Sequence, residues 1–185
     1  MSQTQQNLLR AYAGESMARN KYTTFAKIAR KEGQEFISRV FEETADNERS
    51  HAEELFELIT GPVKTTGDLG IEPFKSTSDN LKMAAAGEKY EWTTMYPDFE
   101  KTAKDEGETV PERLFGELKE VEEKHEERYI ILSKKLDSKT LYDPGVELEW
   151  KCLNCGYIHK GPTPPKNCPV CKKAFTWYQP LGLVR

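Results

Sequence analysis

Two Glu-x-x-His motifs, Glu48 to His51 and Glu122 to His125, are the parts of this sequence best suited to do chemistry. Around the second motif, apolar residues recur in alternating steps of three and four, and Glu122 and His125 continue that series without a break. Both side chains therefore occupy positions that face the inside of a helix bundle. A buried carboxylate and a buried imidazole are costly unless each finds a partner, and a metal ion is a partner that satisfies both.

The competing interpretation is a solvent-exposed helix on which Glu-x-x-His has no role. The chain holds three histidines, and two of them follow a glutamate by three residues. That coincidence and the core-facing phase of both motifs favour a metal site. The third histidine, His159, is expected at the surface, with an outer-sphere role at a metal as the alternative.

Further carboxylates stand at core-facing positions of two other expected helices. Glu15 is the one carboxylate on the inner face of the first helix, unless that helix rotates and lets the side chain reach solvent. Glu88 and Glu91 replace apolar residues in the third helix. One metal takes about four to six ligands, so a larger set with bridging carboxylates suits two metals, and mixed carboxylate and imidazole ligation favours iron or manganese over zinc. The predicted ligands are Glu15, Glu48, His51, Glu88, Glu91, Glu122 and His125.

Four helices would position these residues. Gly33 is expected to end the first helix and Pro62 to follow the end of the second. Pro97 is expected to kink the third helix just past its carboxylates, and Thr109 with Glu112 to form a capping box at the start of the fourth. The expected helices are residues 3–31, 34–59, 76–107 and 109–137, with a long connection at 62–78 that can cross the end of a bundle.

The two halves of this helical region resemble each other. Each half is a helix with a core-facing glutamate followed by a helix with a Glu-x-x-His motif, which indicates a duplicated helical hairpin. Glu91 has no counterpart in the first half, where Met17 or Ala18 stands, so it adds a carboxylate that breaks the symmetry. The matched pairs are Glu48 and Glu122, His51 and His125, and Tyr22 and Tyr96, all 74 residues apart, and Glu15 and Glu88, 73 apart.

Composition narrows the class of protein. With 185 residues, 37% hydrophobic and 31% charged, the chain suits a soluble, helix-rich domain with a small additional module. The net charge of −4 and the pI near 5.6 argue against nucleic acid as a main partner. No stretch is long and apolar enough to span a membrane, and the N-terminus lacks a signal segment. We therefore expect a cytoplasmic protein without a membrane partner.

The four cysteines form two Cys-x-x-Cys pairs, Cys152 with Cys155 and Cys168 with Cys171. In a cytosolic protein this spacing indicates one tetrahedral metal site rather than disulfides. The four thiolates alone fit zinc or iron. The Gly-Tyr after the first pair, the proline inside the second and a redox-capable site upstream favour iron. The expected divisions are a bundle at residues 1–137, a linker at 138–148, and a module at 149–185 that needs its metal to fold.

These two motif sets, in this order, resemble the rubrerythrin family over nearly the whole chain. The resemblance implies a mainly α fold, a ferritin-like four-helix bundle followed by a small rubredoxin-like β module with a mononuclear Fe(Cys)4 site. It implies that the di-iron (Fe2) ligands are Glu15, Glu48, Glu88, Glu122 and His125, with Glu91 and His51 competing for one iron as its oxidation state changes.

The resemblance also assigns roles outside the ligand set. Tyr22 and Tyr96 match tyrosines that donate hydrogen bonds to ligand carboxylates, with ordinary core packing as the alternative. Glu91, His51 and these two tyrosines are therefore the expected catalytic residues. One departure is Lys172, where rubredoxins usually carry a glycine at a turn. That difference is expected to bear on the second cysteine loop and its reduction potential.

The activity implied by the resemblance is a peroxidase that protects against oxidative stress. Hydrogen peroxide would be reduced to water with NAD(P)H-derived electrons, passed by a separate reductase or rubredoxin through the Fe(Cys)4 site. The alternatives are a dioxygen-reducing or ferroxidase activity, iron storage, and a zinc-ribbon binding protein with an inert bundle. We also expect a homodimer or higher homo-oligomer with head-to-tail contacts, because the module hangs from the end of the fourth helix, far from a mid-bundle site.

Overall fold

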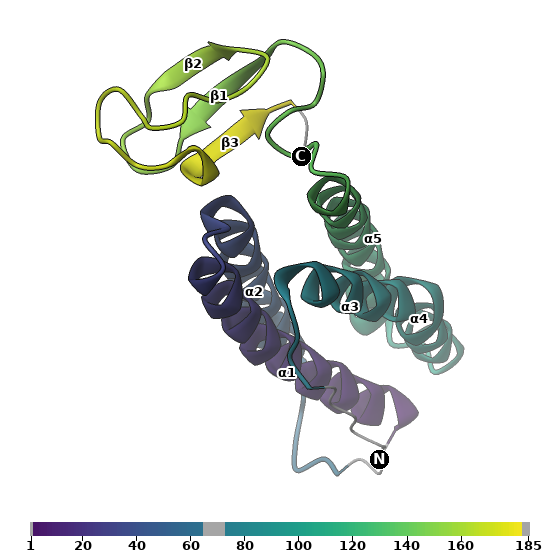
Figure 1. The fold of residues 1–185 in the computed structure, drawn as a ribbon. Coiled ribbons are helices and arrows are strands. Elements are labelled where there is room, and N and C mark those ends of the chain that lie inside the picture. Colours follow the sequence, from purple (N-terminus) through teal and green to yellow (C-terminus); the bar gives the residue numbers. More distant parts are fainter. Residues whose placement is uncertain (1, 65–72, 183–185) are drawn as a thin grey trace.

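The computed structural model describes residues 2–64 and 73–182 (Figure 1). The helices are α1 (Gln3–Lys31), α2 (Glu35–Glu57), α3 (Thr77–Tyr90), the π-helical segment η1 (Glu91–Met95), α4 (Tyr96–Asp105) and α5 (Thr109–Asp137). The strands are β1 (Leu148–Cys152), β2 (Ile158–Gly161) and β3 (Tyr178–Leu181), with a short 3-10 helix η2 (Phe175–Trp177) before β3. This architecture confirms the predicted mainly α bundle with a small β module. The predicted connection at 62–78 lies partly outside the described residues.

The bundle consists of two helical hairpins, as the duplication predicts. Helix α1 packs along α2, and the continuous helix formed by α3, η1 and α4 packs along α5 (Figure 1). Gly33 and Gly107, which are again 74 residues apart, make the two hairpin turns at φ +76° and +75°. Glycine adopts this left-handed conformation without the steric cost that a Cβ brings. The equivalence of the halves therefore extends from the polar residues to the turns.

The start of α5 differs from the prediction. Glu108 is the N-cap residue, its side chain makes no capping hydrogen bond, and Thr109 is already helical. The expected capping box of Thr109 and Glu112 is therefore wrong. The tight turn at Gly107 begins the helix one residue early, and the Glu112 N–H donates to the Glu108 carbonyl at 3.0 Å. The end of α2 also falls at Glu57, two residues before the predicted position.

The third predicted helix contains a π-helical segment rather than a kink at Pro97. The Tyr96 N–H donates to the Glu91 carbonyl, five residues back, which makes room for one extra residue in the turn. Glu88 and Tyr96 are eight residues apart, whereas their counterparts Glu15 and Tyr22 are seven apart. The π segment absorbs this single-residue difference between the halves. It places Glu91 at its first position.

Two apolar clusters fill the bundle, one on each side of the polar residues along its length. One cluster is rich in aromatic side chains and includes Tyr22, Phe25, Phe41 and Tyr129. The other includes Leu8, Tyr96, Phe99 and Phe115. Burying a side chain of this size stabilises the fold by about 1.5–3 kcal/mol. The carboxylates and imidazoles therefore lie in a polar layer between two packed apolar layers, which hold the four helices at fixed positions.

The cysteine module is a three-stranded antiparallel sheet in the order β2-β1-β3. Trp150 is fully buried in its core, and the indole N–H donates to the Gly161 carbonyl at 2.9 Å. The module lies across the end of the bundle where α1 turns into α2 and where α5 ends (Figure 1). Tyr142 joins the two parts, because its ring lies 5.0 Å from that of Phe175 and its hydroxyl donates to the Thr176 carbonyl.

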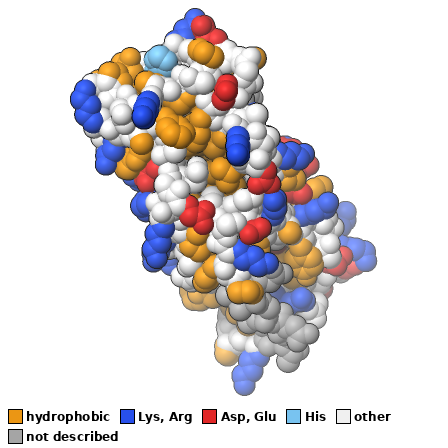
Figure 2. Space-filling model, viewed as in Figure 1, with side chains coloured by type: hydrophobic (Ala, Val, Ile, Leu, Met, Phe, Trp, Pro, Cys, Tyr) orange, Lys and Arg blue, Asp and Glu red, His pale blue; other side chains and the backbone are white. Residues whose placement is uncertain are grey.

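The surface of the bundle is polar. Acidic and basic side chains are interspersed on the face shown in Figure 2, without one large field of a single sign. None of the described helices is long and apolar enough to cross a membrane.

Candidate metal centres

Six of the seven predicted bundle ligands lie together in the polar layer. Their ligand atoms form two groups, each within 4.8 Å, composed of Glu15, Glu48, His51 and Glu122, and of Glu48, Glu88, Glu122 and His125. The carboxylates in both groups are fully buried. Each of the four long helices of the bundle contributes at least one of these residues, because the three-and-four spacing turns them all inward.

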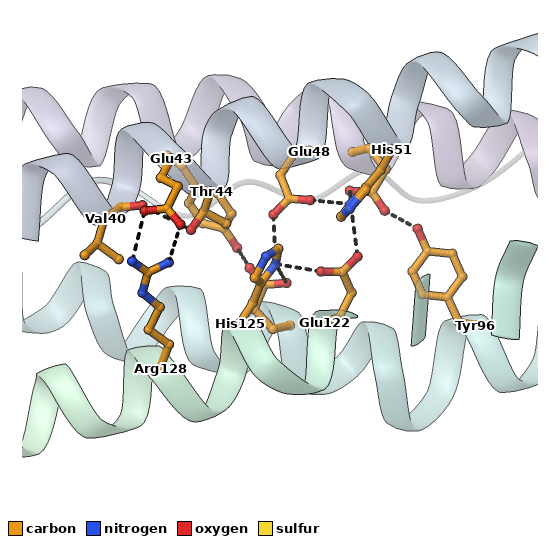
Figure 3. Close-up of polar contacts among 12 residues, drawn as sticks. Val40, Glu43, Thr44, Glu48, His51, Tyr96, Glu122, His125 and Arg128 are labelled. Carbon is orange, nitrogen blue, oxygen red and sulfur yellow. Dashed lines mark hydrogen bonds and ion pairs between the residues drawn. The ribbon is translucent and has the colours of Figure 1, made fainter. Parts of the chain in front are cut away.

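Glu48 and Glu122 belong to both groups and lie between the two imidazoles. Figure 3 shows Glu48 on α2 and Glu122 on α5 facing each other, with His51 at one side and His125 at the other. His51 Nδ1 lies 2.9 Å from a Glu48 oxygen and 3.2 Å from a Glu122 oxygen. His125 Nδ1 lies 2.7 Å from Glu122 and 3.4 Å from Glu48. Two carboxylates shared in this way are the arrangement expected of bridging ligands between two metals.

Several buried polar atoms of this layer have no hydrogen-bond partner among the described residues. They are Glu15 Oε2, Glu48 Oε1, Glu88 Oε2, both carboxylate oxygens of Glu122, and His125 Nδ1. Leaving a buried polar atom unpaired costs about 1–3 kcal/mol, and more for a charged one. Atoms that converge on two points and lack partners fit metal coordination, so the donor set fits two iron ions.

The electrostatics of the layer also favour cations. Burial raises the pKa of Glu15 and Glu88 well above the usual value of a glutamate. Burial acts in the same direction on Glu48, but its contacts with His125 and His51 outweigh that effect and lower its pKa to about 2. Burial acts to lower the pKa of His125, whereas its contacts with Glu122 and Glu48 raise it to about 9. Four carboxylates around two imidazoles thus hold protons in place of the missing positive charge.

Each predicted tyrosine contacts a carboxylate from the opposite half of the duplication. The Tyr22 hydroxyl donates to Glu88, and the Tyr96 hydroxyl donates to Glu15. Both rings are buried, at 1% and 0% exposure. These bonds leave the second oxygen of Glu15 and of Glu88 directed at the clusters. The geometry therefore agrees with an orienting role rather than apolar packing alone.

Glu91 is the one predicted ligand that lies outside both groups. Its side chain is half-buried and begins the π segment, next to Glu88. Burial, together with the charges of Glu122 and Glu48, raises the pKa of Glu91 to about 8. Its assignment as a ligand stays a prediction.

Sequence reasoning missed several side chains around the site. Trp92, in the π segment, donates its indole N–H to the buried carboxylate of Glu126 at 2.5 Å. Arg128 on α5 binds Glu43 on α2 through two hydrogen bonds of 3.0 Å (Figure 3). Lys21 on α1 reaches across to α3. None of these residues interrupts the apolar periodicity in the way that the ligands do, so the pattern carries no signal for them.

The four cysteines form a second group, within the module. Their sulfur atoms lie within 4.8 Å of one another, and the closest pairs, Cys152 with Cys171 and Cys155 with Cys168, are 3.6 Å apart. All four are free thiols. Burial acts to raise the pKa of Cys168, but the backbone N–H of Cys171 and the Tyr178 hydroxyl outweigh it and lower the pKa to about 6. Four converging sulfurs with stabilised thiolate character fit a tetrahedral metal site.

The departure at Lys172 has a structural consequence. Lys172 adopts a left-handed backbone with φ +63° directly after Cys171, which is the conformation that a glycine would occupy without strain. A left-handed non-glycine residue costs roughly 1–2 kcal/mol. The second cysteine loop therefore keeps its turn but at an energetic cost.

Replacing Lys172 with glycine is expected to stabilise the module by about 1 kcal/mol, because the strain is relieved while part of the gain is lost to unfolded-chain entropy. Thermal or denaturant unfolding, followed through the absorbance of the cysteine site, measures the change. Lys151→Gly is the matched control, since Lys151 lies in extended strand β1 and glycine should lower stability there. Equal destabilisation by both substitutions would contradict the assignment of strain to Lys172.

Comparison with known proteins follows from these two sites. A family model described as Rubrerythrin matches residues 6–132, and one described as Rubrerythrin, rubredoxin-like domain matches residues 150–174. The chain belongs to the rubrerythrin family. Membership identifies the Glu and His groups as a di-iron carboxylate centre and the cysteine group as a rubredoxin-like iron site. The chain is therefore an iron-binding oxidoreductase.

Individual relatives agree over nearly the full length. The rubrerythrin of Porphyromonas gingivalis is 40% identical over 181 residues, covering 97% of this chain and 90% of that protein. The rubrerythrin of Nitratidesulfovibrio vulgaris is 38% identical and covers 98% of this chain and 96% of its own. Among solved structures, nigerythrin in a mixed-valence state is similar with a TM-score of 0.67 and 36% identity, covering 97% of this chain and 86% of that one.

Proposed function

We propose that this rubrerythrin is a peroxidase that reduces hydrogen peroxide to two water molecules with two protons and two electrons. The observation that carries the proposal is the pair of metal positions sharing Glu48 and Glu122. Bound iron at two adjacent positions supplies both electrons needed to cleave one O–O bond. The rubredoxin-like module has a place in this activity as an electron inlet, whereas iron storage gives it none. A separate NAD(P)H-dependent reductase or rubredoxin would supply the electrons.

The chain's own side chains have distinct parts in this proposal. Glu48 and Glu122 would bridge the two metal positions, and Glu15, Glu88 and His125 would complete them from α1, α3 and α5. Tyr22 and Tyr96 hold Glu88 and Glu15 in orientation through their hydroxyl groups. The packed aromatic layers on both sides limit the access of bulk water.

Steady-state assays with hydrogen peroxide and with dioxygen, using one reductase and equal substrate concentrations, test the proposal. We expect a higher kcat/KM for peroxide than for dioxygen. Faster dioxygen consumption, or ferrous oxidation without peroxide turnover, would instead support the oxygen-reducing or ferroxidase alternative. Metal analysis of the same protein establishes that the tested sample holds iron in both sites.

Glu91 and His51 are proposed to alternate as ligands in the group that contains Glu15, Glu48 and Glu122. Ferric iron is the harder cation and favours carboxylate, whereas ferrous iron accepts neutral imidazole more readily. The described geometry has His51 in that group and Glu91 beside it. Since the two side chains approach from α2 and from η1, an exchange between them requires movement of the metal rather than of the helices.

Replacing Glu91 with alanine is expected to leave metal loading largely intact, because six bundle ligands remain, and to slow the reaction with peroxide by roughly tenfold, the effect of about 1.4 kcal/mol on a barrier. Thr94→Ala, at an exposed position of the same π segment, is the matched control and should react normally. Crystals of oxidised and dithionite-reduced wild-type protein decide the exchange itself. If one side chain, Glu91 or His51, binds the same iron in both states, no exchange occurs.

The active species is expected to be at least a dimer. From His125 to the end of α5 at Asp137 is twelve residues, or about 18 Å of helix, and the module lies beyond that end. A neighbouring chain packed head-to-tail would bring its Fe(Cys)4 site nearer to these bundle ligands. Sedimentation and turnover measured over the same dilution series test this, and a monomer with full specific activity would refute it.

A further inference from the structure

Lys21 of α1 extends its ammonium group across the bundle toward α3. The side chain is half-buried, and Nζ lies 4.8 Å from the centroid of the Tyr22 ring, in cation–π contact. A Cβ built at Gly87 on α3 would lie 3.3 Å from this Nζ, the nearest atom of another residue that it would meet. The ammonium therefore occupies the space that a side chain at position 87 would need.

The glycine at position 87 has this contact as its packing reason. Gly87 lies in the interior of α3, where glycine is less favourable than alanine. Its φ is not in the left-handed region, so no turn requires it. Room for the Lys21 ammonium is what the absent Cβ provides.

The position beside Gly87 is also the position beside Glu91. Residues four apart share one face of a helix, so Glu91 stacks one turn beyond Gly87. Burial and the charges of Glu122 and Glu48 raise the pKa of Glu91, and the Lys21 ammonium opposes that shift. The cation therefore faces both the tyrosine that holds Glu88 and the carboxylate that lies outside the metal groups.

The ammonium of Lys21 has no committed counter-ion. Within residues 2–64 and 73–182 it forms no ion pair, whereas Lys119, similarly half-buried, is paired with Glu100 at 2.7 Å. A half-buried cation without an anion, next to a half-buried carboxylate without a metal, is an arrangement in which each can neutralise the other.

We propose that Lys21 is a positioning residue whose ammonium is the counter-ion that holds the Glu91 carboxylate whenever His51, rather than Glu91, completes the metal group. The inference rests on the proposed exchange of Glu91 and His51. When the electron reduces the centre and Glu91 is released, its negative charge stays in a half-buried position, and Lys21 balances it there. Because Lys21 stabilises the released carboxylate, it favours the reduced state.

Redox titration of the di-iron centre in the holoprotein, followed by Mössbauer spectroscopy, tests this role without peroxide. Lys21→Met is expected to lower the reduced-to-oxidised ratio at a fixed potential by roughly tenfold, or about 59 mV for a one-electron couple. Lys21→Arg retains the charge and should restore a potential near the wild-type value. Lys27→Met removes an equal charge from an exposed position of the same helix and should leave the potential unchanged. The Fe(Cys)4 signal in each spectrum is the internal reference.

A second cycle isolates the role of Glu91. In a Glu91→Gln background, Lys21→Met should no longer shift the potential, because no carboxylate remains to be held. An equal shift in that background, an equal shift with Lys27→Met, or no shift at all would overturn the inference. The wild-type reduced crystal should also place the Glu91 carboxylate against Lys21 Nζ. A normal shift in a protein that fails to reduce peroxide would refute the peroxidase proposal alone, and normal turnover without a shift would refute only the role of Lys21.

Discussion

Replacing Cys168 with serine is expected to bleach the red colour of the ferric Fe(Cys)4 site and to stop peroxide turnover with a reductase, by at least about a hundredfold. The thiolate of Cys168 is one of four converging sulfurs, and it is fully buried at 0% exposure. A hydroxyl at that position is a poorer ligand for iron than a thiolate, so the electron inlet is lost. Steady-state kinetics and the visible spectrum measure both effects.

Two comparisons separate this loss from general damage. Val170→Ser places the same residue between the same two cysteines at an exposed position and should keep both colour and turnover. In the Cys168→Ser protein, chemically pre-reduced bundle iron should still consume one equivalent of peroxide in a single turnover, because the bundle ligands are intact. Normal steady-state turnover of Cys168→Ser with the reductase would show that electrons enter the bundle by another route.

The bundle site was predictable because its ligands interrupt a strong pattern. Glu48, His51, Glu122 and His125 stand at core-facing steps of three and four, and a helix holds that phase regardless of the details of packing. The four-cysteine site was predictable for a similar reason, since two Cys-x-x-Cys turns leave few other arrangements. The assembly of six ligands follows from helical phase alone once the hairpins are paired.

The features that escaped prediction depend on competition between local and long-range interactions. The spacing of 73 rather than 74 residues between Glu15 and Glu88 shows an extra residue in the second half, but spacing does not decide whether a loop or a helix absorbs it. The expected kink at Pro97 was the local solution, and packing of α4 along α5 favours a continuous helix with a π turn instead. The position of Lys21 depends on how closely α1 approaches Gly87 on α3, which no local pattern records.

The symmetry of the halves makes a quantitative prediction about metal loading. Glu122 belongs to both ligand groups, whereas Glu88 belongs to one. Glu122→Ala is therefore expected to remove both bundle irons and to abolish peroxide reduction, while Glu88→Ala removes one iron and leaves the group of Glu15, Glu48 and His51 able to bind the other. Iron analysis per chain, with the Fe(Cys)4 absorbance counting the third iron, measures the difference.

Glu126→Gln is the control for this comparison, because Glu126 is buried beside His125 and bonded to Trp92 but belongs to neither group. It should retain both bundle irons. Removing a carboxylate from the cluster also relieves repulsion among buried acids, so the metal-free Glu122→Ala protein should unfold no more easily than the metal-free wild type. That stability comparison separates loss of a bridge from loss of the fold. Equal iron content in Glu122→Ala and Glu88→Ala would mean that Glu122 serves one metal only, and the two positions would then be held independently rather than as a bridged pair.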